Sequence, residues 1–275
     1  MLKLAVIGKD VSQSQSPSMH TFILHNMGED CTYDRVSIPE GEFSARIHSV
    51  FDEYDAFNVT IPFKQEIIPH LSHLCGDAAD FGAVNTVLSG TRTGYNTDGF
   101  GFLLMLQNHG VEIKGKSFLV LGAGGAGRSC IRKLTQSGAK VFAYQRTEEK
   151  LKKVYEEIGG FTPLREVPLM PFDVIVNCTG IGMHDTVGQS PVIAFEGGER
   201  APVGRQLLSL CGTAVDLIYV PAQTEFLRIA KEEGKKTVNG ASMLFYQAYM
   251  AGCIYLGCTP KAEQAKALWN AYREE

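Results

Sequence analysis

The sequence predicts an α/β protein with two domains and mainly parallel sheets. Short apolar segments alternate with helical patterns along the whole chain, and parallel strands need helical crossovers of this kind. The chain has 275 residues, which is enough for two medium-sized domains. A glycine-rich segment that follows a strong apolar strand near the middle of the chain indicates that the second domain is of the Rossmann type.

The positions of strands and helices follow from the periodicity of apolar residues. Eight segments combine apolar and β-branched residues between turn residues and are expected to be strands: 2–8, 32–38, 56–60, 83–88, 117–122, 140–144, 172–177 and 214–219. The clearest helices are residues 98–110, a long apolar stretch within 237–257, and an amphipathic segment from Pro260 to about Arg273.

Domain boundaries are expected where this pattern changes. A polar turn after residue 110 precedes a new strong strand at Ser117, so residues 1–110 and 111–236 are expected to form the first and second domains. The helices of residues 237–275 are expected to pack back on the first domain.

Charge and cysteine content exclude several functional classes. The formal net charge is −4 and the basic residues are scattered, so no nucleic-acid partner is expected. No apolar stretch is long enough to cross a bilayer, and the N-terminal apolar run is too short for a signal peptide, so we expect a cytoplasmic protein without a membrane partner. Seven cysteines without a C-x-x-C pair suggest neither a disulfide framework nor a metal site.

The glycine-rich segment predicts a dinucleotide site. A strand ending at Leu121 is followed by Gly122-Ala123-Gly124-Gly125-Ala126-Gly127 and then by a helix with Ile131 and Leu134 on its inner face. In this pattern the first glycine permits a tight turn, the second lets the backbone approach a pyrophosphate, and the last allows close packing of helix and strand. A glycine turn with a purely structural role is the alternative.

The strand after this helix indicates which dinucleotide is bound. An NAD site usually carries an acidic residue about 20 residues after the glycine loop, but here Gln145, Arg146 and Thr147 follow the strand, with Lys150 one turn later. The Arg146 guanidinium can bind a 2′-phosphate with two hydrogen bonds, so NADP is favoured. Alternatively, Arg146 forms a solvated ion pair with Glu148 or Glu149.

Lys64 occupies an unusual position in the first domain. Pro62 suits the first position of a helix, which would place Lys64 in the first turn, where the helix dipole disfavours a cation by roughly 0.3–1 kcal/mol. Breaks in local consistency of this kind are often found at functional sites. A solvated surface lysine is the alternative.

Three further polar positions are candidates for ligand binding. Ser14 and Ser16 precede Pro17 at the expected start of a helix, with Ser16 as its N-cap, where hydroxyls and free N–H groups can bind a small carboxylate or only cap the helix. Asp98 stands at another strand-to-helix junction, where its charge suits a helix start. Asn85 lies among apolar residues, and a buried asparagine needs partners, either structural or in a ligand.

Nine motifs in order make the sequence resemble the shikimate dehydrogenase family. They span nearly the whole chain: SQSP followed by His20, NVTIPFK, GAVNT, GYNTDGFG, GAGGAGR, QRTEEK, NCTGIGM, DLIYVPAQT and NGASMLFYQA. The resemblance implies reversible reduction of 3-dehydroshikimate to shikimate with NADPH, in the biosynthesis of aromatic amino acids. It also implies a substrate-binding catalytic domain followed by an NADP-binding Rossmann-like domain, with the active site in the cleft between them, in a monomer or homodimer.

The resemblance also assigns roles to individual residues. The family's catalytic pair corresponds to Lys64 and Asp98, with Lys64 as the proton-transfer residue. The substrate contacts correspond to Ser14, Ser16, Thr60, Asn85, Tyr219 and Gln247. The cofactor contacts correspond to the loop Gly122, Ala123, Gly124, Gly125 and Ala126, to Arg146, Thr147 and Lys150, and to Leu217, Gly240 and Met243 beside the nicotinamide.

Several positions depart from the family pattern without removing a catalytic group. Asp10, Gln13, Gln145, Cys178 and Gly180 stand where family members commonly have other residues. Gln145 weakens the inference of cofactor preference, whereas Asp10 and Gln13 leave open a related substrate such as quinate. The alternatives are therefore a quinate/shikimate dehydrogenase with relaxed use of NAD and NADP, an unrelated Rossmann oxidoreductase, and a non-catalytic metabolite-binding protein.

Overall fold

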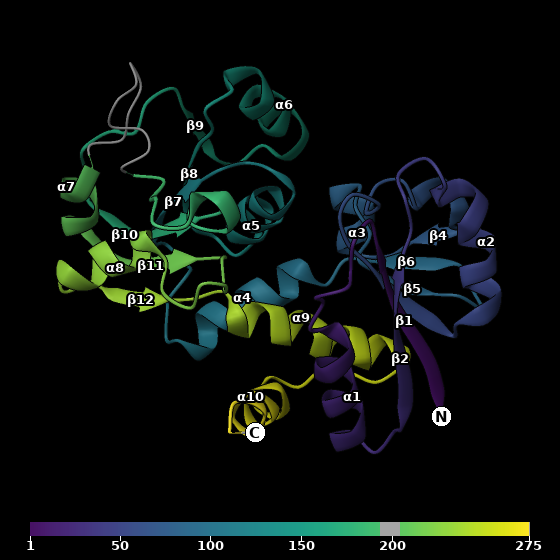
Figure 1. Cartoon of the computed structure of the whole chain (residues 1–275). Coiled ribbons are helices and arrows are strands. Elements are labelled where there is room, and N and C mark those ends of the chain that lie inside the picture. The colour runs from purple at the N-terminus through teal and green to yellow at the C-terminus, as the bar shows by residue number, and fades with distance from the viewer. Residues whose placement is uncertain (193–203, 275) are drawn as a thin grey trace. The chain divides into compact units, whose positions relative to one another are not determined.

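The computed structural model describes residues 1–192 and 204–274, and the chain forms two compact units (Figure 1). Unit 1 comprises residues 1–101 and 244–275, and unit 2 comprises residues 102–243. The chain leaves unit 1 within helix α4 (Asp98–Asn108) and returns within helix α9 (Ala241–Tyr255). These boundaries lie inside helices, whereas the boundaries expected from sequence patterns fall at residues 110 and 236.

Unit 1 is built on a six-stranded sheet in the order β2-β1-β3-β5-β6-β4. Its strands are β1 (Leu2–Gly8), β2 (Cys31–Ser37), β3 (Ala56–Val59), β4 (His73–Leu74), β5 (Thr86–Leu88) and β6 (Thr93–Tyr95). Strand β1 is parallel to both β2 and β3, and β4 is parallel to β6. Strand β5 is antiparallel to both of its neighbours. A turn at residues 89–92 joins it to β6 as a hairpin, which is too short for the crossover that a parallel pair would need.

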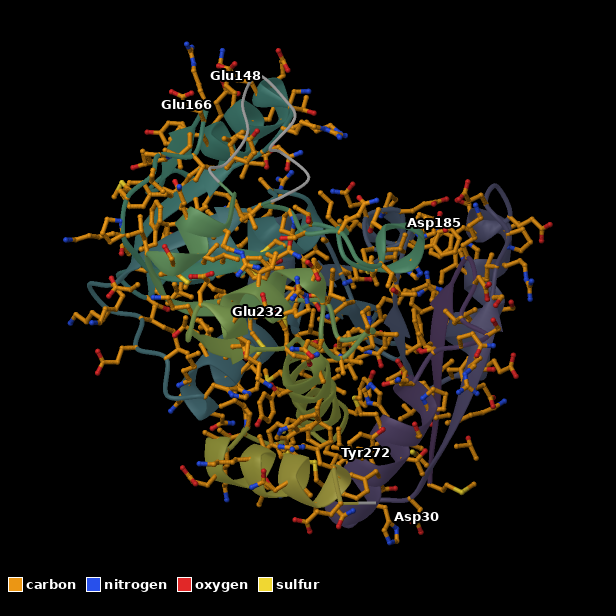
Figure 2. All side chains as sticks on the ribbon, turned by 60° about the vertical axis from the view of Figure 1, so that its left-hand side comes forward. Asp30, Glu148, Glu166, Asp185, Glu232 and Tyr272 are labelled. Atoms are coloured by element: carbon orange, nitrogen blue, oxygen red, sulfur yellow. The ribbon has the colours of Figure 1, made fainter. Side chains whose placement is uncertain are left out.

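Helices cover both faces of this sheet. Alternate residues of β1 point to opposite faces of the sheet. Ala5 and Ile7 belong to the hydrophobic cluster that includes the buried residues of α2 (Phe43–Glu53). Leu4 belongs to a second cluster, which includes Leu24 of α1 (Ser16–Asn26). Short helices occupy Asp77–Phe81 (α3) and Ile68–His70 (η1). In α10 (Ala262–Tyr272), Tyr272 packs against Phe22 of α1, with ring centroids 5.2 Å apart (Figure 2).

Unit 2 contains an all-parallel six-stranded sheet in the order β12-β11-β10-β7-β8-β9. The strands are β7 (Ser117–Leu121), β8 (Lys140–Tyr144), β9 (Thr162–Leu164), β10 (Phe172–Asn177), β11 (Cys211–Asp216) and β12 (Lys236–Val238). Its helices are α5 (Gly125–Gln136), α6 (Glu148–Ile158), η2 (His184–Thr186), α7 (Gly204–Ser209) and α8 (Glu225–Glu232). The strand order reverses between β7 and β10, as in Rossmann folds, where such a switch point binds the ligand. The predicted α/β fold with mainly parallel sheets is confirmed.

Four local predictions differ from the structure. Strand β5 covers only Thr86–Leu88, so residues 83–85, including Asn85, precede the strand. Strand β11 ends at Asp216, so residues 217–219 form a loop beyond the strand. Helix α1 starts at Ser16 and has Gln15 as its N-cap, so Ser16 is a helical residue, one position from the prediction. The predicted helix at Pro62 is absent.

In the described part of the chain, no helix is both long and apolar enough to cross a membrane. Within the same residues, no group of three or more His, Cys, Asp and Glu side chains is arranged to hold a metal ion.

Candidate active site

Lys64 lies in a series of turns, and the prediction that it sits in the first turn of a helix is wrong. The Ile61–Pro62 peptide bond is cis, and Phe63 N–H donates to Thr60 O over three residues in place of a regular helical ladder. The helix-dipole argument therefore does not apply to Lys64. Its backbone is instead anchored by the Val84 N–H, which donates to Lys64 O at 2.7 Å. This bond ties the turn to the segment that precedes β5.

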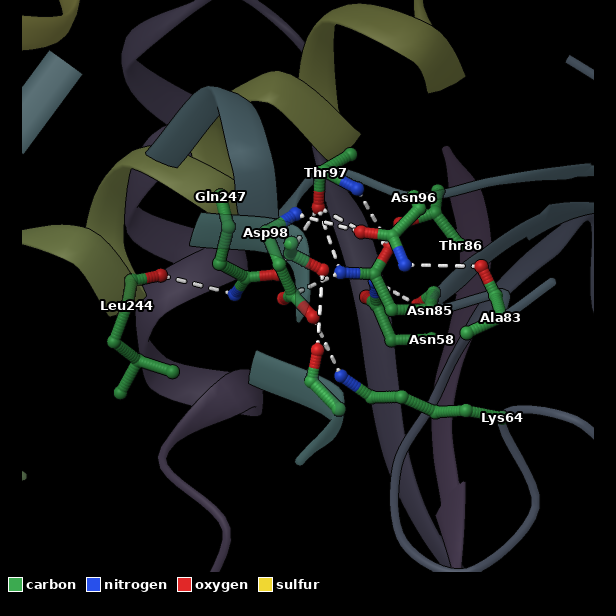
Figure 3. A network of polar contacts seen from close by, with 12 residues as sticks. Asn58, Lys64, Ala83, Asn85, Thr86, Asn96, Thr97, Asp98, Leu244 and Gln247 are labelled. Atoms are coloured by element: carbon green, nitrogen blue, oxygen red, sulfur yellow. Dashed lines mark hydrogen bonds and ion pairs between the residues drawn. The ribbon is translucent and has the colours of Figure 1, made fainter. Parts of the chain in front are cut away.

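The Lys64 ammonium forms an ion pair with Asp98 (Figure 3). The distance from Lys64 Nζ to Asp98 Oδ2 is 2.8 Å, and the two side chains are 29% and 18% exposed. The second carboxylate oxygen, Asp98 Oδ1, accepts a hydrogen bond from Asn85 Nδ2, also at 2.8 Å. Both oxygens of Asp98 are thus held by donors, which fixes the carboxylate and directs the ammonium.

The start of α4 positions Asp98. The Asn96 side chain accepts the Asp98 N–H at 3.1 Å and donates to Ala83 O at 2.9 Å, so it caps the helix and joins it to the segment before β5. The Thr97 hydroxyl donates to Gln247 Oε1 at 3.2 Å, and Gln247 Nε2 donates to Leu244 O on α9. Gln247 is therefore joined to the same polar network (Figure 3).

Unit 1 also holds the two serines and Thr60. Ser14 Oγ donates to Ser16 Oγ at 3.1 Å and accepts the Ser16 N–H at 3.2 Å. The two hydroxyls therefore lie side by side at the N-terminus of α1. Arg35 donates two hydrogen bonds to Ser14 O. Thr60 follows the end of β3, and its N–H donates to Ile7 O at 2.9 Å.

Tyr219 lies in unit 2, 38% exposed, in the loop after β11.

The glycine loop in unit 2 has the geometry that a pyrophosphate site requires. A side chain on Gly127 would place Cβ 2.1 Å from Gly122 O, and Gly122 itself has a φ of +95°. At the start of α5, a Cβ added to either Gly124 or Gly125 would meet no atom within 4 Å, so the helix N-terminus is open. Free N–H groups at an open helix start bind phosphate, so the loop fits a dinucleotide.

A cavity of about 380 Å³ adjoins this loop. It is lined by Gly122, Ala123, Gly124, Tyr144, Gln145, Arg146, Lys150 and the segment Cys178–Ile181. Arg146 and Lys150 are exposed, and Thr147 is the N-cap residue of α6. Glu148, one of the two acids considered as a partner of Arg146, lies 2.9 Å from Arg165 Nε. Two cationic side chains, Arg146 and Lys150, therefore line the cavity beside the glycine loop.

Leu217, Gly240 and Met243 lie outside this cavity lining. Leu217 and Gly240 are in close contact, because a Cβ on Gly240 would be 2.1 Å from Leu217 O. Gly240 N–H donates to Ile218 O at 3.2 Å, which binds the loop after β11 to the start of α9. Met243 stands in the first turn of α9 and is half-buried.

Sequence reasoning missed two buried polar groups that organise these sites. Asn58, within the apolar strand β3, is 6% exposed and hydrogen-bonds the Asn85 segment. Asp216, at the end of β11, is fully buried and accepts from Asn177, Ile218 N–H and Thr224. Burial raises the pKa of Asp216 to about 6, although these three hydrogen bonds oppose the shift. A polar residue at the centre or end of an apolar strand was the available signal in both cases.

Gln145, a departure from the family pattern, contacts the glycine loop directly. Its Oε1 accepts the Ala123 N–H at 2.9 Å. This bond holds the loop against the end of β8. It also means that the Ala123 N–H is used within the protein rather than offered to a ligand. The departure therefore preserves a defined loop conformation.

Comparisons with known proteins agree with both units. Residues 6–87 match the family described as "Shikimate dehydrogenase substrate binding domain", and residues 104–195 match "Shikimate / quinate 5-dehydrogenase". A curated shikimate dehydrogenase (NADP(+)) from Thermus thermophilus is 36% identical over 265 residues, which are 94% of each chain.

Solved structures extend the likeness to the fold. A crystal structure of shikimate 5-dehydrogenase from Thermus thermophilus, in complex with NADP(H) and shikimate, is 35% identical, with a TM-score of 0.82 and 98% of both chains covered. A chorismate mutase/shikimate 5-dehydrogenase fusion protein from Clostridium acetobutylicum is 31% identical, with a TM-score of 0.86, covering 100% of this chain and 98% of that one. The resemblance found in the nine motifs is confirmed, and the chain belongs to the shikimate dehydrogenase family.

Proposed function

We propose that this protein catalyses the reversible, NADP-dependent reduction of 3-dehydroshikimate to shikimate, in the pathway to chorismate and the aromatic amino acids. The observation that carries the proposal is the Lys64–Asp98 ion pair, 2.8 Å long and partly buried. An ammonium held by a carboxylate can give a proton to an oxygen that gains negative charge and can take it back in the reverse reaction. Family membership and the relatives named above supply the substrate and cofactor.

In the proposed mechanism Lys64 is the proton-transfer residue. NADPH, when bound, supplies the hydride that reduces the ketone carbon of the substrate. The Lys64 ammonium donates a proton to the ketone oxygen as that oxygen becomes a hydroxyl, and in the oxidation of shikimate the neutral amine takes the proton from the hydroxyl. Asp98 keeps the ammonium oriented, and Asn85 holds the carboxylate of Asp98.

Substrate binding is assigned to further polar residues of the two units. The hydroxyls of Ser14 and Ser16, at the N-terminus of α1, are suited to a carboxylate. Thr60, Asn85, Gln247 and Tyr219 are proposed to contact the ring hydroxyls. Three of these four lie in unit 1, and two of them, Asn85 and Gln247, are joined to Thr97 by hydrogen bonds.

NADP is proposed to bind to unit 2. The pyrophosphate would lie on the open N–H groups of Gly124, Gly125 and Ala126, at the start of α5. Arg146, with Thr147 and Lys150, would bind the 2′-phosphate at the edge of the cavity of about 380 Å³. Leu217, Gly240 and Met243 are proposed to contact the nicotinamide end. A cytoplasmic location is part of the proposal and is supported by seven free cysteines.

The test is an assay at 340 nm with the purified protein, shikimate or quinate, and NADP or NAD. We expect NADP reduction with shikimate at a kcat/KM at least about tenfold above the other three pairs. For the two nucleotides, this is the preference that one charge-assisted contact to the 2′-phosphate supplies. Comparable values for quinate or NAD would favour the relaxed quinate/shikimate dehydrogenase. Shikimate binding measured by calorimetry, without turnover in either direction, would favour a non-catalytic binding protein.

A further inference from the structure

Asn58 joins two tyrosines to the candidate catalytic pair. Its Oδ1 accepts from the hydroxyl of Tyr33 at 2.6 Å and from that of Tyr255 at 2.7 Å. Its Nδ2 donates to Asn85 O at 3.0 Å and to Thr86 Oγ1 at 3.1 Å. Tyr33 is on β2, Asn58 on β3 and Tyr255 at the end of α9, so three elements of unit 1 meet at one amide.

Two backbone groups determine which way the asparagine amides face. Asn58 lies against the carbonyl oxygen of Asn85, which only accepts, so the Asn58 atom that faces it must be the NH₂ group. Asn85 receives the N–H of Thr97, which only donates, so the Asn85 atom that faces it must be the oxygen. The opposite assignment of either amide would place two acceptors or two donors against each other.

The orientation of these two amides determines which partner donates in each of the neighbouring hydrogen bonds. Because Asn58 presents its oxygen to the tyrosines, both phenols must donate. The Thr86 hydroxyl receives the Asn58 NH₂ and donates to Asn85 Oδ1 at 2.9 Å. The Asn85 NH₂ donates to Asp98 Oδ1 at 2.8 Å. A single chain of donors therefore runs from the two phenols to the carboxylate that holds Lys64 (Figure 3 shows the part from Asn58 onward).

The surroundings keep the phenols in the donor role. Burial raises the pKa of Tyr33 well above its ordinary value and that of Tyr255 likewise, so both remain protonated over the working pH range. His20, fully buried, stacks on the Tyr33 ring with centroids 4.8 Å apart and limits its movement.

We propose that Tyr33 and Tyr255 are positioning residues of the Lys64–Asp98 pair, acting through Asn58, Thr86 and Asn85. Without both hydroxyls, the buried oxygen of Asn58 lacks a donor, and Asn58 gains by turning away from the Asn85 segment. Asn85 then holds Asp98 less firmly, and the ammonium loses its orientation. The inference rests on the proposed function, because the effect is expected on proton transfer.

The test compares Y33F, Y255F and the double variant Y33F/Y255F with the wild-type enzyme in shikimate oxidation. Each single variant leaves Asn58 one donor, so kcat should fall less than about threefold, whereas the double variant should lose at least about tenfold. KM for shikimate and its Kd from calorimetry should stay within about threefold. T86V, which breaks the chain at a second link, should also lower kcat, and adding it to the double variant should cause little further loss.

Y249F is the matched control. Tyr249 is also on α9, is fully buried, and its hydroxyl contacts Gln264 at 3.0 Å and Lys261 rather than Asn58. The midpoint of thermal unfolding of Y249F should fall as in the other variants, whereas its kcat should be unchanged. A double variant with wild-type kcat, or one in which KM alone changes, would overturn the inference. If Y33F/Y255F does not fold, T86V decides by the same criteria.

A readout independent of turnover separates this inference from the proposed function. The side-chain amide protons of Asn85 in ¹⁵N-labelled protein should be protected from exchange in the wild type and lose protection at least about tenfold in T86V and Y33F/Y255F, but not in Y249F. Unchanged protection in the first two variants would refute the chain, whatever the activity. A wild-type protein without dehydrogenase activity, but with these losses of protection, would refute the proposed function alone.

Discussion

The Lys64 ammonium lies 2.8 Å from Asp98 although the two residues are 34 positions apart in the sequence. Lys64 reaches this position from a turn after β3, and Asp98 reaches it from the first turn of α4. The second oxygen of the carboxylate is occupied by Asn85, so the ammonium has one defined partner and one defined direction. The predictions for Lys64 follow from this geometry.

Replacing Lys64 by alanine should lower kcat by about 10²–10⁴-fold, because the proposed general acid is lost, with a smaller change in KM for shikimate. Steady-state kinetics in both directions measure the effect. K3A is the control, since Lys3 forms an exposed ion pair with Glu53 at 3.0 Å in the same unit. A change in KM alone would make Lys64 a binding residue.

The oxidation of shikimate by the wild type should accelerate as the pH rises above neutral, because in the proposed mechanism the neutral amine of Lys64 takes the proton from the substrate hydroxyl. Reduction should remain efficient near neutral pH, because in the proposed mechanism it uses the ammonium as the proton donor. The measurement is kcat between pH 6 and pH 10 in both directions, with a solvent or substrate isotope effect to establish that chemistry limits the rate. A flat oxidation profile under those conditions contradicts the role of Lys64 as the base.

Removal of the Arg146 side chain should raise KM for NADP by roughly 10–100-fold, the equivalent of one lost charge-assisted contact, and leave KM for NAD nearly unchanged. Only NADP carries the 2′-phosphate that the guanidinium would bind. R205A serves as the control, because Arg205 pairs with Glu232 and Glu233 on the surface of unit 2 (Glu232 is labelled in Figure 2). Equal effects of R146A on the two nucleotides would exclude phosphate recognition by this residue.

A methyl group at position 127 should abolish tight NADPH binding. In G127A the new Cβ would approach Gly122 O to 2.1 Å, which forces the glycine loop and α5 apart and costs about 1–3 kcal/mol of stability. Fluorescence titration with NADPH and the thermal midpoint report the two effects. G90A, where a Cβ meets no atom within 4 Å, should change neither quantity. NADPH binding of wild-type strength in G127A would refute the close-approach argument.

The buried carboxylate of Asp216 should make stability depend on pH in an unusual direction. Because burial raises its pKa from 3.8 to about 6, the folded protein favours the protonated form, so this group's contribution is full below pH 4 and is lost as the pH rises through 6. In D216N the amide avoids this loss, and the hydroxyl of Thr224 can accept its NH₂ group. The stability of D216N relative to wild type should therefore increase by roughly 2 kcal/mol between pH 4 and pH 7.

Urea unfolding of both proteins at several pH values checks this prediction. D173N is a contrasting control, because the pKa of the exposed Asp173 is lowered, chiefly by its hydrogen bond from the Ser117 backbone. Its pH dependence should have the opposite sign. A constant difference between D216N and wild type across the range would show that Asp216 does not titrate with folding.

Much of the fold and of the candidate site was predictable because it depends on local patterns. The alternation of apolar strands and helices predicted the α/β class, and the spacing of Gly122, Gly124 and Gly127 predicted the strand-loop-helix unit, in which each glycine meets a steric requirement within a few residues. The short strands β4, β6, β9 and β12 have two or three residues each and too little periodicity to be recognised.

By itself, the sequence determined the class of fold, the dinucleotide loop and, through ordered motifs, the family and the identity of the candidate site residues. Only the tertiary structure decided why Lys64 is placed as it is: its turn is held by Val84 and its ammonium by Asp98, whereas local rules had suggested a helix. It also revealed Asn58 and Asp216 as organising groups. The physical reason is that a hydrogen bond between distant residues depends on how strands are paired and how buried polar groups are satisfied, and neither is expressed in the local sequence.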